Sequence, residues 1–393
     1  MKAMKWKFYS LAFVAGMSIL TACSSDDNND NDGNGGNGNG NEIENGTILK
    51  GTITSDVTLA AGNTYKLSGE YIVEEGATLH IEEGVKIIAV YDDIADYILV
   101  KQGGKINAVG TPDKPIVMTS EKEEPGAWGG IHICGRAHTN AEGGKGSSEI
   151  GGAVYGGNDD ADNSGTLQYI RLEYTGFAFD EEHEANGISF YGVGNGTIVD
   201  HCQAYKGSDD GFEFFGGSVN VSNLVAVSCS DDSFDWTEGW NGKGTNLVAY
   251  QEDKSTLGYD CDCLMECDNN GSNNAATPVA HPVLKNLILV GNGGSKQGIR
   301  LRAGTEVEID NAKVCGKGQP LTVETALTEN ALKNGTSKLT NITLTSELSS
   351  KEGIYTHADF IAVTSNKVDA NLSYSSFEDI RKECSWMNGS WGK

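Results

Sequence analysis

The chain has 393 residues, with 29 Lys or Arg against 55 Asp or Glu, so its formal net charge is −26. A charge of this sign repels nucleic-acid phosphates, which argues against nucleic-acid partners. Glycine contributes 52 residues and proline only 6, which is too little proline for a collagen and favours many short strands joined by tight turns.

Residues 1–22 have the pattern of a secretory signal peptide. Lysines near the start precede an apolar stretch from Leu11 to Leu20, which is too short to span a bilayer. The stretch ends in the sequence LTAC at 20–23, which resembles the bacterial lipobox. That resemblance implies that Cys23 becomes the acylated first residue of the mature chain and anchors it in the outer membrane.

Residues 23–46 are predicted to be a disordered tether. From Ser24 to Asn45 the chain consists almost entirely of Ser, Asp, Asn and Gly, so it has no apolar face to bury. Asp26 and Asp27 resemble the acidic export signal of Bacteroidetes surface lipoproteins. This resemblance implies display on the outer face of the outer membrane, and the alternative is an anchored protein that faces the periplasm.

The rest of the chain repeats itself. The sequence DDGFEF at 209–214 aligns with DDSFDW at 231–236, at an offset of 22 residues. The same register extends to segments that begin at Gly130, Asn186, Asp262 and Gly298. Each segment alternates apolar and variable residues, as a strand with one buried face does. A repeat this short suits one turn of a parallel β-solenoid.

A second column of asparagines lies between these strands. Its members recur at intervals of 23, 40, 25 and 30 residues: Asn223, Asn246, Asn286, Asn311 and Asn341. Asparagines stacked on successive turns can form hydrogen bonds from amide to amide along the axis. The two columns together predict an all-β fold, a right-handed parallel β-helix, as a single domain over residues 47–393.

The predicted solenoid needs caps, because its terminal turns would expose core and strand edges. We expect the caps at 47–73 and near Trp386 and Trp391. The glycine-rich insert from Ala137 to Gly165 is too long for a turn, so it is expected to fold over one flank.

Eight of the nine cysteines follow Cys23. Because secretion leads to an oxidising compartment, we expect a disulfide in the loop that holds Cys261, Cys263 and Cys267. Unpaired buried thiols are one alternative, and a metal site at this loop is another.

Several segments together resemble a known family. They are TLHIEEGV at 78–85, GAWGG at 126–130, YGGN at 155–158 with NSGTL at 163–167, and the stretch 209–242. In these segments the chain is similar to Bacteroidetes-type β-helix surface lipoproteins of uncharacterised function. The resemblance covers nearly the whole mature domain and implies a fold and a location, but no activity.

The repeat predicts an acidic patch on one face. Equivalent residues on adjacent turns lie about 4.8 Å apart, and alternation places the aromatic residues of 212–214 and 234–236 inside. The outward column is then His132, Ser189, Glu213, Asp235, Met265 and Arg300. Flanking it at the strand starts are Asp209, Asp210, Asp231 and Asp232. Six stacked carboxylates cost free energy unless they are protonated, paired or bridged by a cation.

Three interpretations of this patch remain open. The aspartates cap turns by hydrogen bonds to the backbone, and the face is simply solvated. Alternatively, Asp209, Asp210, Asp231 and Asp232 bind Ca²⁺, which prefers six to eight oxygen ligands. In the third interpretation Glu213 and Asp235 are an acid/base pair, with Arg300 and His132 nearby, an arrangement that resembles β-helix polygalacturonases. Their Gly-His-Gly signature is absent here.

Aromatic residues lie beside the patch. Tyr191, Phe215 and Trp240 are candidates for a shelf on which sugars stack, and the alternative is packing at turn corners. The sequence therefore predicts a non-catalytic surface lipoprotein that binds a glycan or a protein partner, with Ca²⁺ as the candidate cofactor. The alternative function is a polysaccharide hydrolase or lyase that uses carboxylates on adjacent turns.

Overall fold

The structure is a computed structural model that describes residues 41–92, 94–179 and 183–393. The predicted signal peptide, Cys23 and the tether up to residue 40 lie outside the described residues. None of the helices in the described part is long and apolar enough to cross a membrane.

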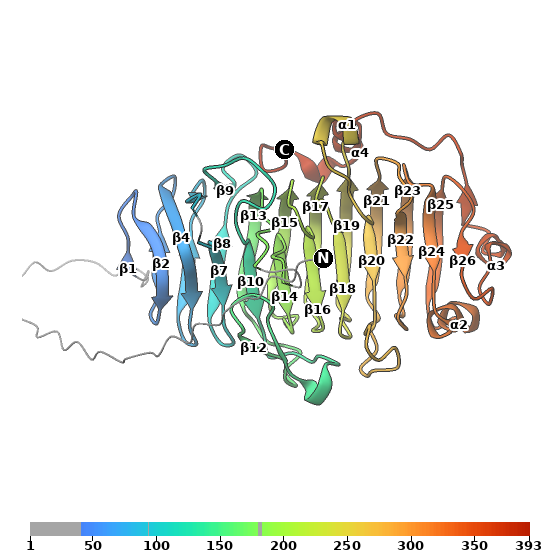
Figure 1. The fold of residues 1–393 in the computed structure, drawn as a ribbon, viewed down its shortest axis with the longest axis horizontal. Coiled ribbons are helices and arrows are strands. Elements are labelled where there is room, and N and C mark those ends of the chain that lie inside the picture. The colour runs from blue at the N-terminus through green and yellow to red at the C-terminus, as the bar shows by residue number, and fades with distance from the viewer. Residues whose placement is uncertain (1–40, 93, 180–182) are drawn as a thin grey trace, which may run out of the picture. The chain divides into compact units, whose positions relative to one another are not determined.

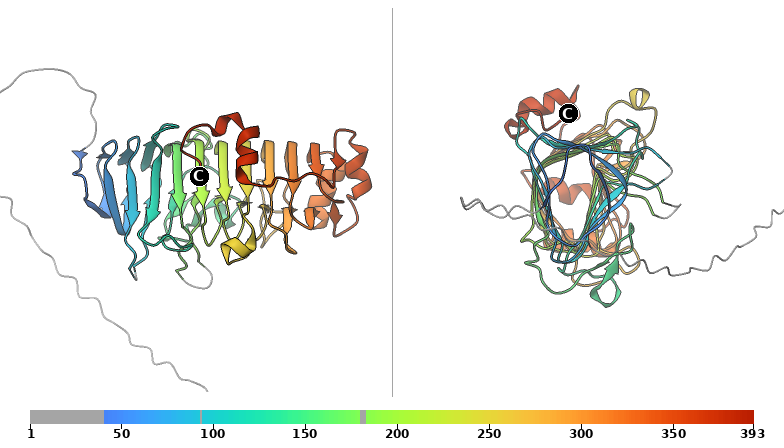
Figure 2. Two further views of the ribbon diagram at one scale, coloured as in Figure 1. Left: turned by 90° about the horizontal axis from the view of Figure 1, so that it is seen from above. Right: turned by 90° about the vertical axis from the view of Figure 1, so that its left-hand side faces the viewer.

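In the described part of the chain, twenty-five strands form one continuous parallel sheet that winds into a β-helix (Figure 1). The predicted fold class, an all-β right-handed parallel β-helix, is confirmed. Each turn contributes to three ladders of paired strands, which enclose the core when viewed along the axis (Figure 2, right).

Ladder 1 carries the candidate site. It contains β2 (Ile48–Ile53), β4 (Thr64–Val73), β7 (Tyr97–Val100), β10 (Ile131–Cys134), β14 (Ile188–Tyr191), β16 (Phe212–Phe215), β18 (Phe234–Thr237), β20 (Met265–Cys267), β22 (Gln297–Leu301), β24 (Gln319–Val323) and β26 (Ser349–Ser350).

Ladders 2 and 3 share long strands that bend in the middle. The shared strands are β13 (Gly165–Glu173), β15 (Ile198–Tyr205), β17 (Asn220–Val227), β19 (Lys243–Tyr250), β21 (Val283–Val290), β23 (Glu308–Cys315) and β25 (Lys338–Leu344). Ladder 2 also contains β1 (Asn41–Glu42), β3 (Val57–Leu59), β5 (Thr78–Ile81) and β8 (Lys105–Val109). Ladder 3 also contains β6 (Lys86–Ala89), β9 (Ile116–Ser120) and β27 (Lys367–Val368), and it begins with parts of β2 and β4.

The asparagine column forms the bend between ladders 2 and 3. Each asparagine has a left-handed backbone, with φ between 55° and 62°. The amide of Asn246 donates to Asn223 at 2.8 Å, and that of Asn286 donates to Asn246 at 3.0 Å. Asn311 donates to Asn286 at 2.8 Å, whereas Asn341 turns to Asp310. The predicted amide ladder is therefore confirmed as far as Asn311.

Alternation fills the interior with large apolar side chains. Phe190 stacks on Phe214 with ring centroids 5.1 Å apart, and Phe212 stacks on Phe234 at 5.6 Å. Such aromatic pairs contribute about 0.5–1.5 kcal/mol each beyond the area that they bury. Both rows lie inside, so the residues between them face outward, as predicted.

The N-terminal end starts earlier than expected. The two residues of β1 already pair with β3, although residues 41–46 belong to the range that we predicted as tether. Ile43 packs against the core, and the hydroxyl of Tyr65 donates to the Ile43 carbonyl at 3.2 Å. Residues 41–46 therefore belong to the first turn.

The cap at the C-terminal end was predicted in the wrong place. Helices α2 (Ala326–Asn334) and α3 (His357–Ala362) cover this end, and Leu332, Tyr355 and Phe360 are part of the main core. Trp386 and Trp391 lie instead in a segment, residues 370–393, that runs back along the outside of ladder 3 (Figure 2, left). We call this segment the strap.

The strap contains α4 (Phe377–Glu383) and a short 3-10 helix (Ser385–Met387). Its buried residues Ile380, Met387 and Trp391 pack on outward valines of β17 and β19. Ladder 3 carries apolar residues on both faces, and the strap covers the outer one.

The predicted insert covers a flank of ladder 1, as expected. Within it, β11 (Gly146–Ser147) and β12 (Val154–Tyr155) form an antiparallel pair. Ile150, Ala153 and Tyr155 are buried in a cluster with Leu99, Tyr191 and Phe215. A second insert follows β19 and holds the short helix α1 (Lys254–Leu257).

The expected disulfide is not found. All eight cysteines of the described residues are free and buried, in agreement with the alternative of unpaired thiols. Alternation explains part of this result, because Cys202 and Cys267 occupy inward positions in the core. A buried thiol behaves there as a small apolar side chain.

Candidate functional site

The outward column of ladder 1 differs from the prediction at one position. Pairing runs from His132 to Ser189, Glu213, Asp235, Glu266 and Arg300. Met265 was predicted in this column but is buried in the core. A strand that buries both Met265 and Cys267 must point Glu266 outward, so the column holds three consecutive carboxylates.

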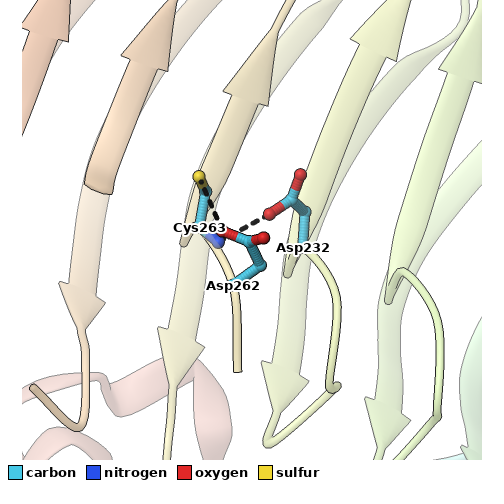
Figure 3. A group of neighbouring side chains, drawn as sticks. All are labelled: Asp232, Asp262 and Cys263. Atoms are coloured by element: carbon cyan, nitrogen blue, oxygen red, sulfur yellow. Dashed lines mark hydrogen bonds between the residues drawn. The ribbon is translucent and has the colours of Figure 1, made fainter. Parts of the chain in front are cut away.

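The turn aspartates form hydrogen bonds between turns. Asp210 Oδ1 accepts the backbone N–H of Asp232 at 2.8 Å. In the same way, Asp232 Oδ1 accepts the backbone N–H of Cys263 at 2.6 Å, which Figure 3 shows. The turn-capping interpretation is therefore confirmed for one oxygen of each of these two side chains. Gly211 follows Asp210 because a Cβ there would come within 2.6 Å of the Ser233 carbonyl oxygen.

Seven neighbouring carboxylates form one connected cluster, which we call the acidic strip: Asp209, Asp210, Glu213, Asp231, Asp232, Asp235 and Glu266. Their oxygens form three groups within which every ligand atom lies within 4.8 Å of the others. One group joins the turn residues Asp209, Asp210 and Asp231. The second joins Asp210, Glu213 and Asp235, and the third joins Asp232, Asp235 and Glu266.

Burial makes this concentration of charge costly. Asp210 and Asp232 are buried, and Asp209, Glu213 and Asp235 are half-buried. Burial, followed by the charge of Asp231, raises the pKa of Asp209 to about 7. Burial and neighbouring carboxylates raise the pKa values of Glu213 and Asp235 well above the usual range. The free-energy cost falls when the strip binds protons or a cation.

Basic side chains compensate only one end of the strip. Arg300 pairs with Glu266 at 2.8 Å and with Glu324 at 3.3 Å, and Arg302 pairs with Glu266 and with Asp268. Within the described residues, no salt bridge joins Asp209, Asp210, Glu213 or Asp235 to a basic side chain. The Asp210–Glu213–Asp235 group is therefore the end at which no basic side chain forms a salt bridge within the described residues.

Two buried oxygens at this end have no hydrogen-bond partner. One is Asp235 Oδ1, and the other is Oδ1 of Asn186. Asn186 is 1% exposed, and its amide donates to Glu213 at 2.6 Å and to Ser189 at 3.0 Å. Sequence analysis did not select Asn186, although it stands two residues before Ile188, as Asp210 stands before Phe212.

The donor set suits a hard cation. The Asp210–Glu213–Asp235 group offers only carboxylate oxygens, and Ca²⁺ prefers oxygen ligands. The group of Asp232, Asp262 and Cys263 in Figure 3 differs because it includes a thiol. Burial and the Asp232 charge raise the pKa of the Cys263 thiol, and a protonated thiol is a poor metal ligand.

His132 holds its predicted place in the outward column, but its side chain is not available beside the carboxylates. The side chain is 0% exposed, between the rings of Tyr97 and Tyr191. Its Nε2 lies 2.7 Å from the Gly129 carbonyl oxygen, and burial lowers its pKa to about 4. His132 is therefore a neutral, buried residue on the outer face of ladder 1, two strands away from Glu213. Arg300 does face outward, but Glu266 and Glu324 hold it.

The predicted sugar-stacking shelf is also wrong. Tyr191, Phe215 and Trp240 are 0%, 7% and 1% exposed. Tyr191 and Phe215 stack at 4.4 Å beneath the insert, and Trp240 lies inside, 4.2 Å from the ring of Phe214. The alternative of packing at turn corners is confirmed, because the insert and the turns enclose these rings.

The comparison with protein families matches the fold. The family model described as a pectate-lyase-like β-helix domain matches residues 51–393. Searches of curated proteins and of solved structures gave no match. The family match spans nearly every turn of the solenoid, including the acidic strip. The chain therefore belongs to the family of pectate-lyase-like β-helix domains.

Proposed function

We propose that this protein is a lipid-anchored protein of the outer membrane that binds a glycan or a surface partner through Ca²⁺ held at the acidic strip. The observation that carries the proposal is the Asp210–Glu213–Asp235 group. Its oxygens lie within 4.8 Å of one another, and Asp235 Oδ1 is buried without a partner. A cation at this group would replace the missing positive charge and leave positions for ligand oxygens.

The location rests on the N-terminal sequence. The lipobox-like LTAC and the acidic pair Asp26 and Asp27 support an anchor that faces outward, and an anchored protein in the periplasm is the alternative. The net charge of −26 supports a ligand that meets the strip through a cation, because an acidic glycan would otherwise be repelled.

Binding is favoured over catalysis because the other expected catalytic groups are unavailable. His132 is buried between Tyr97 and Tyr191, and Arg300 is held by two carboxylates. The strip thus offers charge and oxygen ligands, but no free basic group beside Glu213 within the described residues.

Calcium titration tests the proposal. The protein should bind Ca²⁺ in calorimetry at pH 8, and 100 × Kd of Ca²⁺ should stabilise it by about 2.7 kcal/mol. This corresponds to a rise in melting temperature of several degrees. The double variant Glu213→Gln/Asp235→Asn should lose the binding heat and this rise, whereas Asp113→Asn, at an exposed position, should keep both. Equal titrations in all three proteins would contradict the proposal.

The pH dependence gives a second readout. The folded-state pKa values of Asp209, Glu213 and Asp235 are raised, so the folded protein holds protons that the unfolded chain has lost. Without metal, stability should therefore fall as pH rises from 5 to 8. Ca²⁺ should raise the melting temperature more at pH 8 than at pH 5, because protons compete with it at the lower pH.

One observation favours catalysis as a second candidate function. Glu213 and Asp235 are paired neighbours with oxygens within 4.8 Å, close to the ~5–5.5 Å separation of retaining glycosidases. A product screen on acidic polysaccharides tests it with the wild type and with Glu213→Gln and Asp235→Asn separately. Products that disappear in either variant would establish an enzyme, whereas products that persist in both would place the active site elsewhere.

A further inference from the structure

A groove of about 220 Å³ lies where the strap crosses the asparagine column. The groove is bounded by Asn246, Asn286 and Asn311 on the solenoid and by Trp386 on the strap. Lys313 and Glu383 also line it. It lies at the bend between ladders 2 and 3, whereas the acidic strip lies on ladder 1.

The asparagines supply a row of polar groups. Asn286 and Asn311 are exposed, and each amide nitrogen uses one N–H for the ladder along the axis. An amide has two N–H donors and an oxygen with two lone pairs, so each side chain keeps a donor and an acceptor for a ligand. Successive asparagines repeat at about the 4.8 Å spacing of paired strands.

The strap supplies an aromatic ring beside this row. Trp386 is half-buried, and its position is supported by Trp391 and His201, whose ring centroids lie 6.1 and 6.2 Å from its own. An indole that packs against two other rings and lines a groove offers a rigid apolar surface, which loses little entropy on binding.

The charges of the groove cancel. Both charged residues of the lining, Lys313 and Glu383, form a salt bridge with each other, so the lining carries no net charge, although the whole chain carries −26. The groove therefore suits an uncharged ligand with an apolar face and several hydroxyl groups. A sugar ring has this chemistry.

We propose that this groove binds a neutral sugar residue, with one ring face against Trp386 and its hydroxyls on the amides of Asn286 and Asn311. The inference rests on the proposed function in that the ligand is a glycan. It adds a site that needs no Ca²⁺ and is separate from the acidic strip. A glycan that runs along the axis would meet one asparagine per turn.

Titration with neutral oligosaccharides tests the proposal. Gluco-, manno- and xylo-oligosaccharides are titrated into the full mature protein, with calorimetry and tryptophan fluorescence as readouts, in EDTA. At least one series should bind. Trp386→Ala should weaken that binding at least tenfold, and Trp386→Phe, which keeps an aromatic ring, should weaken it less. Tyr91→Ala, at a residue that is 53% exposed and does not line the groove, should leave it unchanged.

The outcomes separate the two sites. Glu213→Gln/Asp235→Asn should abolish Ca²⁺ binding and leave the neutral sugar bound. If no neutral oligosaccharide binds, or if Trp386→Ala binds as tightly as the wild type with the same melting temperature, the groove proposal is wrong and the calcium titration still stands. If binding requires Ca²⁺ and fails in the double variant, the sugar occupies the acidic strip, which also overturns the groove.

Discussion

Asparagine at the bend between ladders 2 and 3 shows how a single residue type serves two needs. The bend requires a left-handed backbone, which asparagine adopts more readily than most residues with a side chain. The same side chain then donates to the asparagine of the preceding turn, as Asn286 does to Asn246. The spacing of the column predicted these hydrogen bonds, but it did not predict that the column is the corner of the solenoid.

Glu329 illustrates a buried charge that stabilises rather than strains the fold. It lies on α2, and its carboxylate accepts backbone N–H groups of Glu352, Ile354 and Tyr355 and the hydroxyl of Ser350. Burial alone would raise its pKa, but these hydrogen bonds outweigh burial and lower it. Glu329 therefore fastens the loop before α3 to the end of the solenoid.

Glu329→Gln should lower the free energy of unfolding by about 2–3 kcal/mol at pH 7, because an amide NH₂ would face backbone donors. The folded-state pKa is lowered, so the carboxylate contributes stability above its unfolded pKa, and this contribution is lost as pH falls through the folded pKa. Denaturant titrations from pH 7 to 3 should therefore show the two proteins converging at the acid end. A constant difference at all pH values would mean that the charge is not responsible.

At the scale of elements, two segments decide which outward faces are open. The insert buries Tyr191 and Phe215 on ladder 1, and the strap buries Val225 and Val248 on ladder 3. Hydrogen bonds hold the strap in place: Arg171 donates to the carbonyl of Trp391 at 3.1 Å, and the backbone of Lys393 pairs with the side chain of Gln203.

Trp391→Ala tests whether the strap is an integral part of the fold. Trp391 is fully buried, so its truncation should cost about 3–5 kcal/mol. Hydrogen exchange measured on this variant should show that the backbone amides of the strap exchange faster than those of the central strands. Ile361→Ala, at an exposed position on α3, serves as the control and should change stability by less than about 0.5 kcal/mol. Unchanged exchange in the strap of Trp391→Ala would show that other contacts hold it.

At the scale of the whole molecule, the negative charge is unevenly distributed. The acidic strip concentrates carboxylates on one ladder, whereas the groove at the strap is neutral through Lys313 and Glu383.

The anchor has its own test. If the proposed anchor is correct, Cys23→Ser should move the protein from the membrane fraction to the soluble fraction, because the thiol that would carry the lipid is lost. Asp26→Ala/Asp27→Ala should keep the protein in the membrane fraction but protect it from protease added to intact cells. Continued surface digestion of the double variant would show that these aspartates are not the export signal.

The sequence by itself determined the repeating turn, the inward aromatic rows, the amide ladder and the neighbourhood of Glu213 and Asp235. These features follow from alternation and a short period, which are local properties of the chain. Only the tertiary structure decided that Glu266 replaces Met265 in the outward column and that His132 and Trp240 are enclosed. It also decided that α2 and α3 cover the C-terminal end of the solenoid, whereas the strap packs along ladder 3. The reason is that the path of an insert or a terminal segment depends on contacts with residues far away in the sequence, for which no periodic pattern exists.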